Sequence, residues 1–343
     1  MDQFFYQSTE RLIRMLELFI EKPLHLELRE NSETRSLKDD EVRIKVKYGG
    51  ICGSDLSVYK GKFSHAVYPI RPGHELVGTI VEKGKYSPYE EGTRVVVLPN
   101  TFCSECEMCK QGKTNICVNK KAVGINQEGG FAEEFIISSR FVWPIPDDLS
   151  DDRAILIEPF AVVVSGLNKV KISEGMSVAV VGTGAIGLLA ASLAYSFGAN
   201  VTGIDVNTKK HQLVREIGNI RAVYPNDIKD EKFDIVIEAA GTEEAVIQSI
   251  QILKPGGSMV ALGITGDVKI PYIQVVRNDL TIYGSIIYKF PQDYEKTIEY
   301  LRNPSVNVDS IVSKIVSLQE YQTAFQDALS GNFGKILIDF NIK

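Results

Sequence analysis

The stretch Ser177-Val-Ala-Val-Val-Gly-Thr-Gly-Ala-Ile-Gly187 joins an apolar run to a glycine-rich turn and then to a helical pattern. The apolar run is typical of a buried strand, and the residues after the turn have the periodicity of a helix. A second apolar run follows and ends at Asp205. Strand, glycine turn, helix, strand and acid in this order predict a doubly wound α/β domain with a parallel sheet.

The turn also predicts a nucleotide site. Its G-x-G-x-x-G pattern is made by Gly182, Thr183, Gly184, Ala185, Ile186 and Gly187. The first glycine permits the tight turn, the second lets the backbone approach a pyrophosphate at the helix N-terminus, and the third allows close helix packing. The alternative is a glycine turn that binds nothing.

Asp205 stands where a carboxylate accepts hydrogen bonds from both ribose hydroxyls and repels a 2′-phosphate. This position favours NAD over NADP. Lys209 and Lys210 follow closely and offer cations to such a phosphate, which weakens the preference. We expect His211, on the next helix, to occupy a solvated position.

The rest of the chain divides into two regions with different sequence patterns. At 343 residues the length predicts about two domains. Residues 41–48 alternate apolar and charged side chains, and similar short runs recur up to about residue 150, so this part is expected to be mostly β. After Pro159 strands alternate with helices, as a parallel sheet requires. The last segment ends in a strand-like run, Lys335 to Phe340, which is a candidate to return to the first part.

Composition and charge exclude several classes of protein. With 44% hydrophobic and 24% charged residues the chain is of the globular class. A net charge of -6 offers no basic surface for nucleic acid. The charged N-terminus lacks a secretory signal, so we expect a cytoplasmic protein. The uncharged stretch between Glu174 and Asp205 has the pattern of a strand, a turn and a helix. It is therefore not one continuous apolar helix, and no membrane span is expected.

Four of the five cysteines, Cys103, Cys106, Cys109 and Cys117, lie within one short lobe. Four thiolates at this spacing can close a tetrahedron around one Zn²⁺ with no position left for water, which is the arrangement of a structural site. An iron–sulfur cluster and two disulfides are the alternatives. The expected reducing compartment argues against the disulfides.

The fifth cysteine, Cys52, stands alone, and a solitary thiol is more often a buried apolar residue than a ligand. Its candidate partners are His74, Glu75 and Glu158. Cysteine, histidine and glutamate are ligand types of a catalytic zinc, which keeps three protein ligands and one open position. Spacing alone leaves both interpretations open.

Together these motifs resemble the zinc-dependent medium-chain alcohol and polyol dehydrogenases. The resemblance rests on the order of Cys52-Gly-Ser-Asp55, Gly73-His-Glu75, the cysteine lobe, Glu158-Pro159 and the glycine turn. It covers nearly the whole chain and is closest to the sorbitol-dehydrogenase-like branch, because a glutamate directly follows the histidine. It implies a GroES-like catalytic domain over residues 1–165, with 1–14 a possible extension, a Rossmann domain over 166–299, and a return to the catalytic domain over 300–343.

The resemblance also implies roles for single residues. Cys52, His74 and Glu75 would bind the catalytic zinc, and Glu158 would be a fourth ligand or the acceptor that holds the zinc-bound water. Ser54 would take the substrate proton. Many relatives have histidine where this chain has Ser57, so the usual imidazole relay is in doubt. Two zinc ions per chain, NAD and a homodimer or homotetramer are implied as well.

The expected reaction is hydride transfer between NAD and a secondary alcohol, giving the ketone. The carboxylate-rich zinc site favours polyols, sugar acids or phosphorylated polyols. The alternatives are an L-threonine-type or simple-alcohol dehydrogenase and, from another class, a non-catalytic NAD-binding redox sensor.

Overall fold

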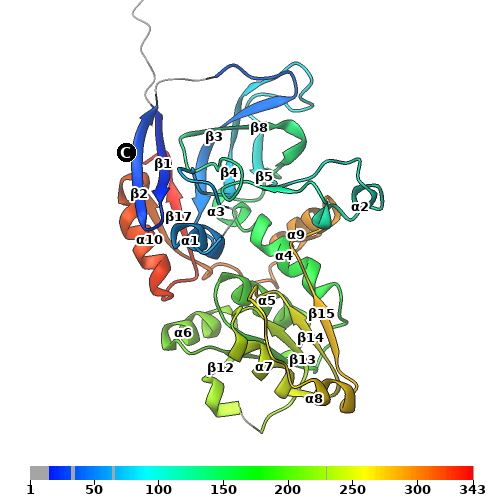
Figure 1. Cartoon of the computed structure of the whole chain (residues 1–343). Coiled ribbons are helices and arrows are strands. Elements are labelled where there is room, and N and C mark those ends of the chain that lie inside the picture. Colours follow the sequence, from blue (N-terminus) through cyan, green and yellow to red (C-terminus); the bar gives the residue numbers. More distant parts are fainter. Residues whose placement is uncertain (1–14, 32–34, 64–65, 229, 343) are drawn as a thin grey trace, which may run out of the picture.

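The computed structural model describes residues 15–31, 35–63, 66–228 and 230–342. The possible extension over residues 1–14 lies outside these ranges. The described chain forms two parts stacked one on the other, with helices α4 and α9 between them (Figure 1).

The second part contains a six-stranded parallel sheet with the order β12-β11-β10-β13-β14-β15. Its strands are β10 (Ser177–Val181), β11 (Asn200–Ile204), β12 (Arg221–Val223), β13 (Phe233–Glu238), β14 (Leu253–Ala261) and β15 (Thr281–Gly284). Its helices are α5 (Ala185–Ser196), α6 (Thr208–Ile217), α7 (Glu243–Gln251), α8 (Tyr272–Arg277) and a 3₁₀ turn at Pro225–Ile228. The predicted doubly wound parallel sheet is confirmed.

The uncharged stretch between Glu174 and Asp205 folds as β10, α5 and β11 within this sheet domain. Its apolar side chains are buried because both faces of a parallel sheet are covered by helices. No helix in the described part of the chain is both long enough and apolar enough to cross a bilayer.

The first part is built on a mixed sheet with the order β16-β17-β3-β4-β5-β9, from which β8 branches by pairing with β3. A hairpin of β1 and β2 and a pair of β6 and β7 lie beside it. The strands are β1 (Met15–Lys22), β2 (His25–Asn31), β3 (Glu41–Gly50), β4 (Glu75–Lys83), β5 (Arg94–Val97), β6 (Asn100–Thr101), β7 (Lys121–Ala122), β8 (Glu134–Ser138), β9 (Val142–Pro144), β16 (Val312–Ser317) and β17 (Lys335–Asp339).

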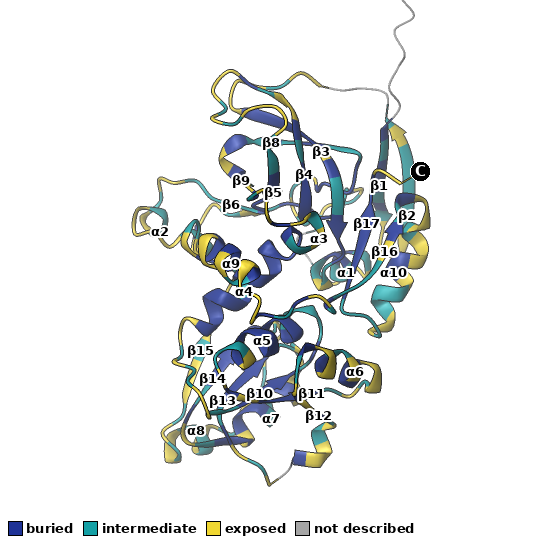
Figure 2. Ribbon diagram, turned by 180° about the vertical axis from the view of Figure 1, so that it is seen from behind, coloured by how far each residue is buried: buried dark blue, intermediate teal, exposed yellow. Residues whose placement is uncertain are grey.

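Short helices connect these strands. They are α1 (Gly53–Tyr59), α2 (Glu107–Lys110), α3 (Asp151–Ala154), α4 (Ile157–Leu167), α9 (Gln292–Arg302) and α10 (Tyr321–Ser330), with 3₁₀ turns at Thr114–Ile116, Ser139–Phe141 and Leu318–Glu320. Helix α4 is buried over nearly its whole length and packs against both α9 and α5 (Figure 2). It therefore fixes the distance between the two sheets.

Strand β17 pairs antiparallel with β3, so the C-terminal segment lies in the same sheet as the first strands. Strand β3 also pairs with β4, where Gly50 stands opposite Glu75. The C-terminal end of β3 thus lies beside the N-terminal end of β4 and beside β17.

Candidate active site

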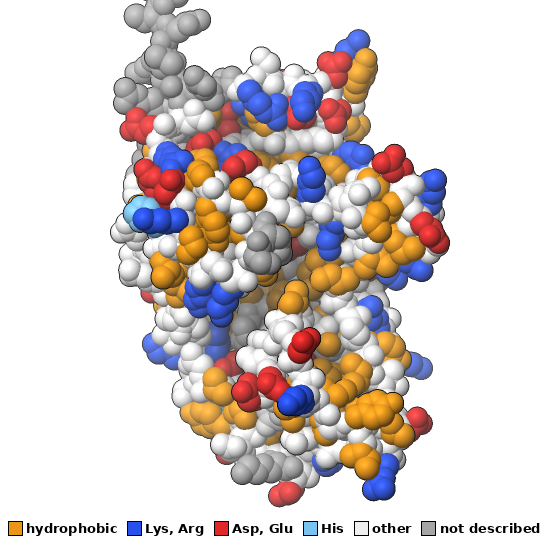
Figure 3. Space-filling view, in the orientation of Figure 1, with side chains coloured by type: hydrophobic (Ala, Val, Ile, Leu, Met, Phe, Trp, Pro, Cys, Tyr) orange, Lys and Arg blue, Asp and Glu red, His pale blue; other side chains and the backbone are white. Residues whose placement is uncertain are grey.

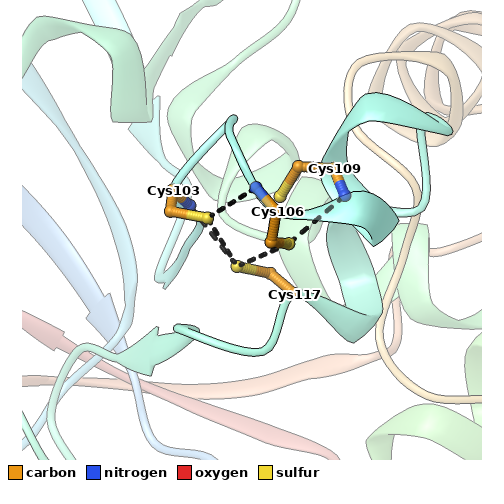
Figure 4. Close-up of side chains that lie close together, drawn as sticks. All are labelled: Cys103, Cys106, Cys109 and Cys117. Atoms are coloured by element: carbon orange, nitrogen blue, oxygen red, sulfur yellow. Dashed lines mark hydrogen bonds between the residues drawn. The ribbon is translucent and has the colours of Figure 1, made fainter.

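The four lobe cysteines converge on one point (Figure 4). Their ligand atoms all lie within 4.8 Å of one another, and all four thiols are free. The Cys103–Cys117 and Cys106–Cys117 sulfurs are 3.6 and 3.9 Å apart, far beyond the length of a disulfide bond. The disulfide alternative is therefore wrong, and the cluster has the shape of a four-thiolate metal site.

Backbone amides favour the thiolate form of Cys103 and Cys106, whereas burial raises the pKa of Cys109 to about 12. Cys106 is the N-cap of α2, and its sulfur accepts a hydrogen bond from Cys109 N at 3.5 Å. Backbone N–H groups of Glu105 and Cys106 lower the pKa of the Cys103 thiol to about 6. Because the thiolate is the metal ligand, a lowered pKa favours binding near neutral pH.

A second group of ligand atoms is formed by Cys52, His74 and Glu75, again within 4.8 Å of one another. Cys52 is the N-cap of α1, directly after β3, and His74 immediately precedes β4. The pairing of β3 with β4 brings the three residues together. Glu158 is not part of this group.

Asp55 holds the histidine and was not assigned a role from the sequence. It is fully buried, and its carboxylate accepts from Cys52 N at 2.9 Å and Gly73 N at 3.0 Å. Its Oδ1 lies 3.3 Å from His74 Nδ1. Burial raises the pKa of Asp55, but His74 and the two amides outweigh it and lower the pKa. A carboxylate behind a ligand histidine orients the ring toward the metal.

One carboxylate oxygen of Glu75 forms an ion pair, and the other has no hydrogen-bond partner among the described residues. Its Oε1 accepts from Lys335 Nζ at 2.6 Å, and both side chains are at most 3% exposed. Its Oε2 is buried and has no hydrogen-bond partner among the described residues. Burial lowers the pKa of Lys335, but the negative charges of Glu75 and Cys52 outweigh it and raise the pKa. A buried carboxylate with one oxygen lacking a partner, in a group with a thiol and an imidazole, fits a metal ligand.

Glu158 lies on the first turn of α4 and is 7% exposed. Burial raises the pKa of this carboxyl to about 7, and Glu75 adds to the effect while His74 opposes it. A carboxyl with such a pKa can exchange a proton near neutral pH.

Ser54 and Ser57 lie on α1. Ser54 Oγ lies 3.3 Å from His74 Nε2, which places this hydroxyl beside the candidate metal site. Ser57 Oγ donates to Gly53 O at 2.9 Å and is thus used by its own helix.

The glycine turn has the geometry that the sequence predicts. Gly182 has φ +85°, and a Cβ at Gly187 would lie 1.9 Å from Gly182 O. Beside the turn is a mainly apolar cavity of about 370 Å³, and its lining includes Gly182, Asp205, Pro225 and Thr242. This cavity lies at the carboxyl ends of β10 and β11, where open parallel sheets bind ligands.

The carboxylate of Asp205 is hydrogen-bonded to the glycine turn. Its Oδ2 accepts from Thr183 N at 2.7 Å and from Thr183 Oγ1 at 2.9 Å, and its Oδ1 accepts from Asn207 N at 2.9 Å. The carboxylate therefore braces the glycine turn as well as bordering the cavity.

The two lysines and the histidine after Asp205 differ in environment. Lys210 is 5% exposed and donates to Phe333 O, whereas Lys209 is exposed. The expectation of a solvated His211 is wrong, because this residue is 4% exposed, its ring lies 4.6 Å from Tyr224, and its Nε2 lies 2.9 Å from Asp205 O. His211 therefore contacts the backbone directly after the C-terminal end of β11.

Comparison with known protein families finds two family models that match this chain. A family model described as "Alcohol dehydrogenase GroES-like domain" matches residues 38–147, and a model described as "Zinc-binding dehydrogenase" matches residues 185–303. The first match confirms the expected GroES-like character of the first part.

Curated relatives match over most of their length. A sorbitol dehydrogenase of Bacillus subtilis is 32% identical over 85% of this chain and 88% of its own. An L-threonine 3-dehydrogenase of Deinococcus deserti is 30% identical over 88% of this chain and 92% of its own.

Solved structures agree with this result. A putative zinc-binding dehydrogenase of Sinorhizobium meliloti bound to NADP has a TM-score of 0.88 and 28% identity, covering 95% of this chain and 99% of its own. An Escherichia coli alcohol dehydrogenase complexed with NADH has a TM-score of 0.87 and 26% identity, over 95% and 99%.

Proposed function

The chain belongs to the zinc-binding dehydrogenases that carry an alcohol dehydrogenase GroES-like domain, and on this premise we propose that it transfers hydride between NAD and a secondary alcohol of a polyol, sugar acid or other sugar-derived compound, giving the ketone. The observation that carries the proposal is the buried group of Cys52, His74 and Glu75, whose ligand atoms lie within 4.8 Å of one another, together with Glu75 Oε2, which has no hydrogen-bond partner among the described residues. A non-catalytic redox sensor has no use for such an oxygen, because leaving it unpaired costs free energy.

Cys52, His74 and Glu75 would hold the catalytic zinc. His74 Nδ1 faces Asp55, so Nε2, which lies 3.3 Å from Ser54 Oγ in this structure, is the nitrogen that would bind the ion. A zinc ion bound there supplies a Lewis acid beside the substrate oxygen, while the nicotinamide supplies the hydride acceptor. The position of Glu158 outside the ligand group favours its second predicted role, in which it binds a water molecule or a substrate hydroxyl.

Ser54 would accept the proton that the substrate hydroxyl releases, since its Oγ lies beside His74 Nε2. Ser57 does not continue this relay, because its hydroxyl is bonded to Gly53 O. Solvent or a ribose hydroxyl would take the proton from Ser54.

The substrate class rests on two carboxyl groups, Glu75 and Glu158, which make the site polar. A diol could place one oxygen on the metal and the next against Glu158. A site built this way rejects analogues that lack the second hydroxyl, because its buried polar groups would stay unpaired. Relatives named for sorbitol and for L-threonine leave both classes to be compared.

A panel of sorbitol, xylitol, galactitol, butane-2,3-diol, threonine and propan-2-ol, followed by NADH absorbance, tests the proposal. Polyols should show the higher kcat/KM. If monohydric alcohols lead, the polyol assignment is wrong while the hydride transfer stands, and a lead for threonine selects the second candidate.

NAD is proposed over NADP because Asp205 borders the cavity with a negative charge. Burial of Lys210 against Phe333 O removes one of the two cations that could bind a 2′-phosphate. Related structures bound to NADP and to NADH show that the family accommodates both cofactors.

The lobe of Cys103, Cys106, Cys109 and Cys117 would hold a second, structural zinc, so the proposed content is two ions per chain. The proposed domains are 1–165, 166–299 and 300–343, with the last segment returning to the first. Pairing of β17 with β3 supports this division. A cytoplasmic location is proposed as well, from the free thiols, which fit a reducing compartment.

A homodimer or homotetramer is proposed from an apolar surface on the second part. Strand β15 is an edge strand, and α8 beside it has no buried residue. Hydrophobic side chains gather over these elements at the lower right of Figure 3, and Tyr272, Ile273 and Val276 are each at least 59% exposed. An unprotected edge strand is a template for pairing with a second copy. Sedimentation of the purified protein tests this assembly.

A further inference from the structure

A buried carboxyl group lies at the carboxyl end of the parallel sheet, and no step of the proposed function uses it. Glu238 is the last residue of β13 and is fully buried. Its strand pairs with β10, which leads into the glycine turn, and Glu238 stands opposite Val181. Strand β11 lies on one side of β10 and β13 on the other, so the strand order reverses between β10 and β13. Open parallel sheets bind dinucleotides across such a point.

The carboxyl group of Glu238 holds the loop that follows β13. Its Oε1 accepts from Ala240 N at 2.8 Å and from Gly241 N at 2.7 Å. Ala240 in turn lies against the glycine turn, because a Cβ at Gly182 would lie 2.6 Å from Ala240 N. Both Gly182 and Ala240 line the cavity beside that turn. One hydrogen bond therefore joins Glu238 to the wall of the proposed nucleotide site.

The other carboxylate oxygen of Glu238 faces the loop that follows β14. A Cβ at Gly263 would lie 2.5 Å from Oε2, so this oxygen lies directly beside the backbone of Gly263. Gly263 N donates to the backbone at Glu238 O at 3.0 Å. The carboxyl group is thus enclosed between the loops that leave two neighbouring strands.

No cation balances this carboxyl group within the described part of the chain. The buried Glu75 pairs with Lys335, whereas no ion pair joins Glu238 to a described cation. Burial raises the pKa of Glu238, and the backbone amides beside it oppose this rise. A glutamine would accept the same two hydrogen bonds without bringing a charge into the interior, where an unpaired charge costs free energy. Support of the loop alone therefore does not explain a carboxylate at this position.

The proposed cofactor supplies the missing positive charge in one of its two redox forms. The oxidised nicotinamide ring is a cation, and the reduced ring is neutral. With the adenosine ribose at Asp205 and the pyrophosphate at the glycine turn, the other half of the dinucleotide extends away from β11, over β13 and β14. Glu238 therefore lies on the side of the site that receives the nicotinamide.

We propose that the negative charge of Glu238 strengthens the binding of NAD⁺ relative to NADH. The carboxylate attracts the cationic ring through the interior of the protein and has no such interaction with the neutral ring. The inference rests on the proposed function and deepens it, because it assigns the redox form of the cofactor that this residue favours. By thermodynamic reciprocity, Glu238 also makes the bound nicotinamide harder to reduce.

The test measures Kd by titration calorimetry for three probes: NAD⁺, NADH and ADP-ribose, which lacks the nicotinamide. The variant E238Q removes the charge but keeps an oxygen that can accept from Ala240 N and Gly241 N. It should raise Kd for NAD⁺ about 10-fold, the size of one charge–charge interaction at the effective dielectric constant of a protein. Kd for NADH and for ADP-ribose should stay within about twofold, because neither places a cation at the ring position.

D234N is the matched control, since it removes a carboxylate from the same strand. Asp234 stands four residues before Glu238, roughly 13 Å away at the rise of a strand, and pairs with Lys254. D234N should leave the ratio of the two Kd values unchanged. E238A also removes the acceptor of two amides, so it should weaken the binding of all three probes.

An unchanged Kd for NAD⁺ in E238Q, equal weakening of all three probes in that variant, or the same change of ratio in D234N would each overturn the inference. A measurement on the parent protein tests it without any variant. A neutral isostere of NAD⁺, with benzamide in place of nicotinamide, should bind about 10-fold more weakly than NAD⁺. Equal affinity would overturn the inference as well.

These titrations need no alcohol, so they decide the inference even when no compound of the panel is oxidised. Such a result would contradict the proposed reaction while the preference for NAD⁺ stands. A parent protein that binds neither nucleotide would contradict both.

Discussion

Lys335 Nζ and Glu75 Oε1 lie 2.6 Å apart although 260 residues separate them in the chain. The lysine also donates to Ile51 O at 3.3 Å, so it ties the residue before Cys52 to the same carboxylate. This ion pair fixes Oε1 of Glu75, while Oε2 has no hydrogen-bond partner among the described residues. A carboxylate oxygen of Glu75 lies within 4.8 Å of the ligand atoms of Cys52 and His74. The last strand of the mixed sheet thereby takes part in the site built by its first strands.

Replacement of Lys335 by methionine should destabilise the protein by about 3–5 kcal/mol, because it leaves a buried carboxylate without its counter-charge. Urea unfolding measures the change. The control is K296M, which breaks the exposed Lys296–Glu299 pair and should change stability little. Equal effects of the two substitutions would contradict the importance of burial.

Gly50 is required by the position of Glu75. A Cβ at Gly50 would lie 2.3 Å from Glu75 Oε2, whereas one at Gly53 would have nothing within 4 Å. G50A should therefore displace the carboxylate, reduce the zinc content from two ions to one and abolish most activity. G53A should keep both ions. Elemental analysis decides the outcome, and two ions in G50A would exclude Glu75 as a ligand.

The two cysteine sites should respond differently to mutation. C103S should lose one zinc and lower Tm by more than about 5 °C, because structural zinc binding in small zinc domains contributes on the order of 10 kcal/mol to folding. C52S should also lose one zinc but keep Tm close to that of the parent protein. Unaltered melting of C103S would show that the lobe does not need its metal.

Replacement of Asp205 by alanine should lower kcat/KM for NAD about 10- to 100-fold, since hydrogen bonds to a charged group contribute about 1.5–3 kcal/mol. The value for NADP should rise because the repulsion is removed. T183V is the control, as it removes one hydrogen bond to Asp205 while keeping the charge. Comparable kcat/KM for both cofactors in the parent enzyme would show that Lys209 outweighs the carboxylate.

Lys210 gives the protein a predicted dependence of stability on pH. Burial lowers the pKa of Lys210 to about 8 from 10.5. Between these values the unfolded chain binds more protons at this residue, so the free energy of unfolding should rise with pH by at most about 1.4 kcal/mol per unit. Unfolding curves of K210M should lack this rise, and those of K209M, which alters an exposed neighbour, should retain it.

The parts of the site that lie in one stretch of chain could be predicted from sequence. The cysteine lobe and the glycine turn are local patterns, and their spacing alone specifies the geometry. Asp55 stood in the quoted motif three residues after Cys52, and the N-cap pattern it forms there is a signal that could have identified its role.

The role of Lys335 could not be predicted in this way, because it depends on packing between segments far apart in the chain. The only signal for Lys335 is a single charge at the start of a strand that is otherwise apolar up to Asp339. His211 was predicted wrongly because two lysines precede it on a polar helix, while Tyr224, from the strand connection that follows, covers its ring.

The return of β17 to β3 has a consequence for biosynthesis. During translation Glu75 leaves the ribosome on the order of tens of seconds before Lys335, at about 5–20 residues per second. In that interval a carboxylate destined for the interior has no counter-charge, and β3 lacks its neighbour strand. The lobe cysteines, by contrast, follow one another within fifteen residues. A nascent chain can therefore close its lobe early, whereas the pocket of Cys52, His74 and Glu75 is completed only when the C-terminal strand arrives.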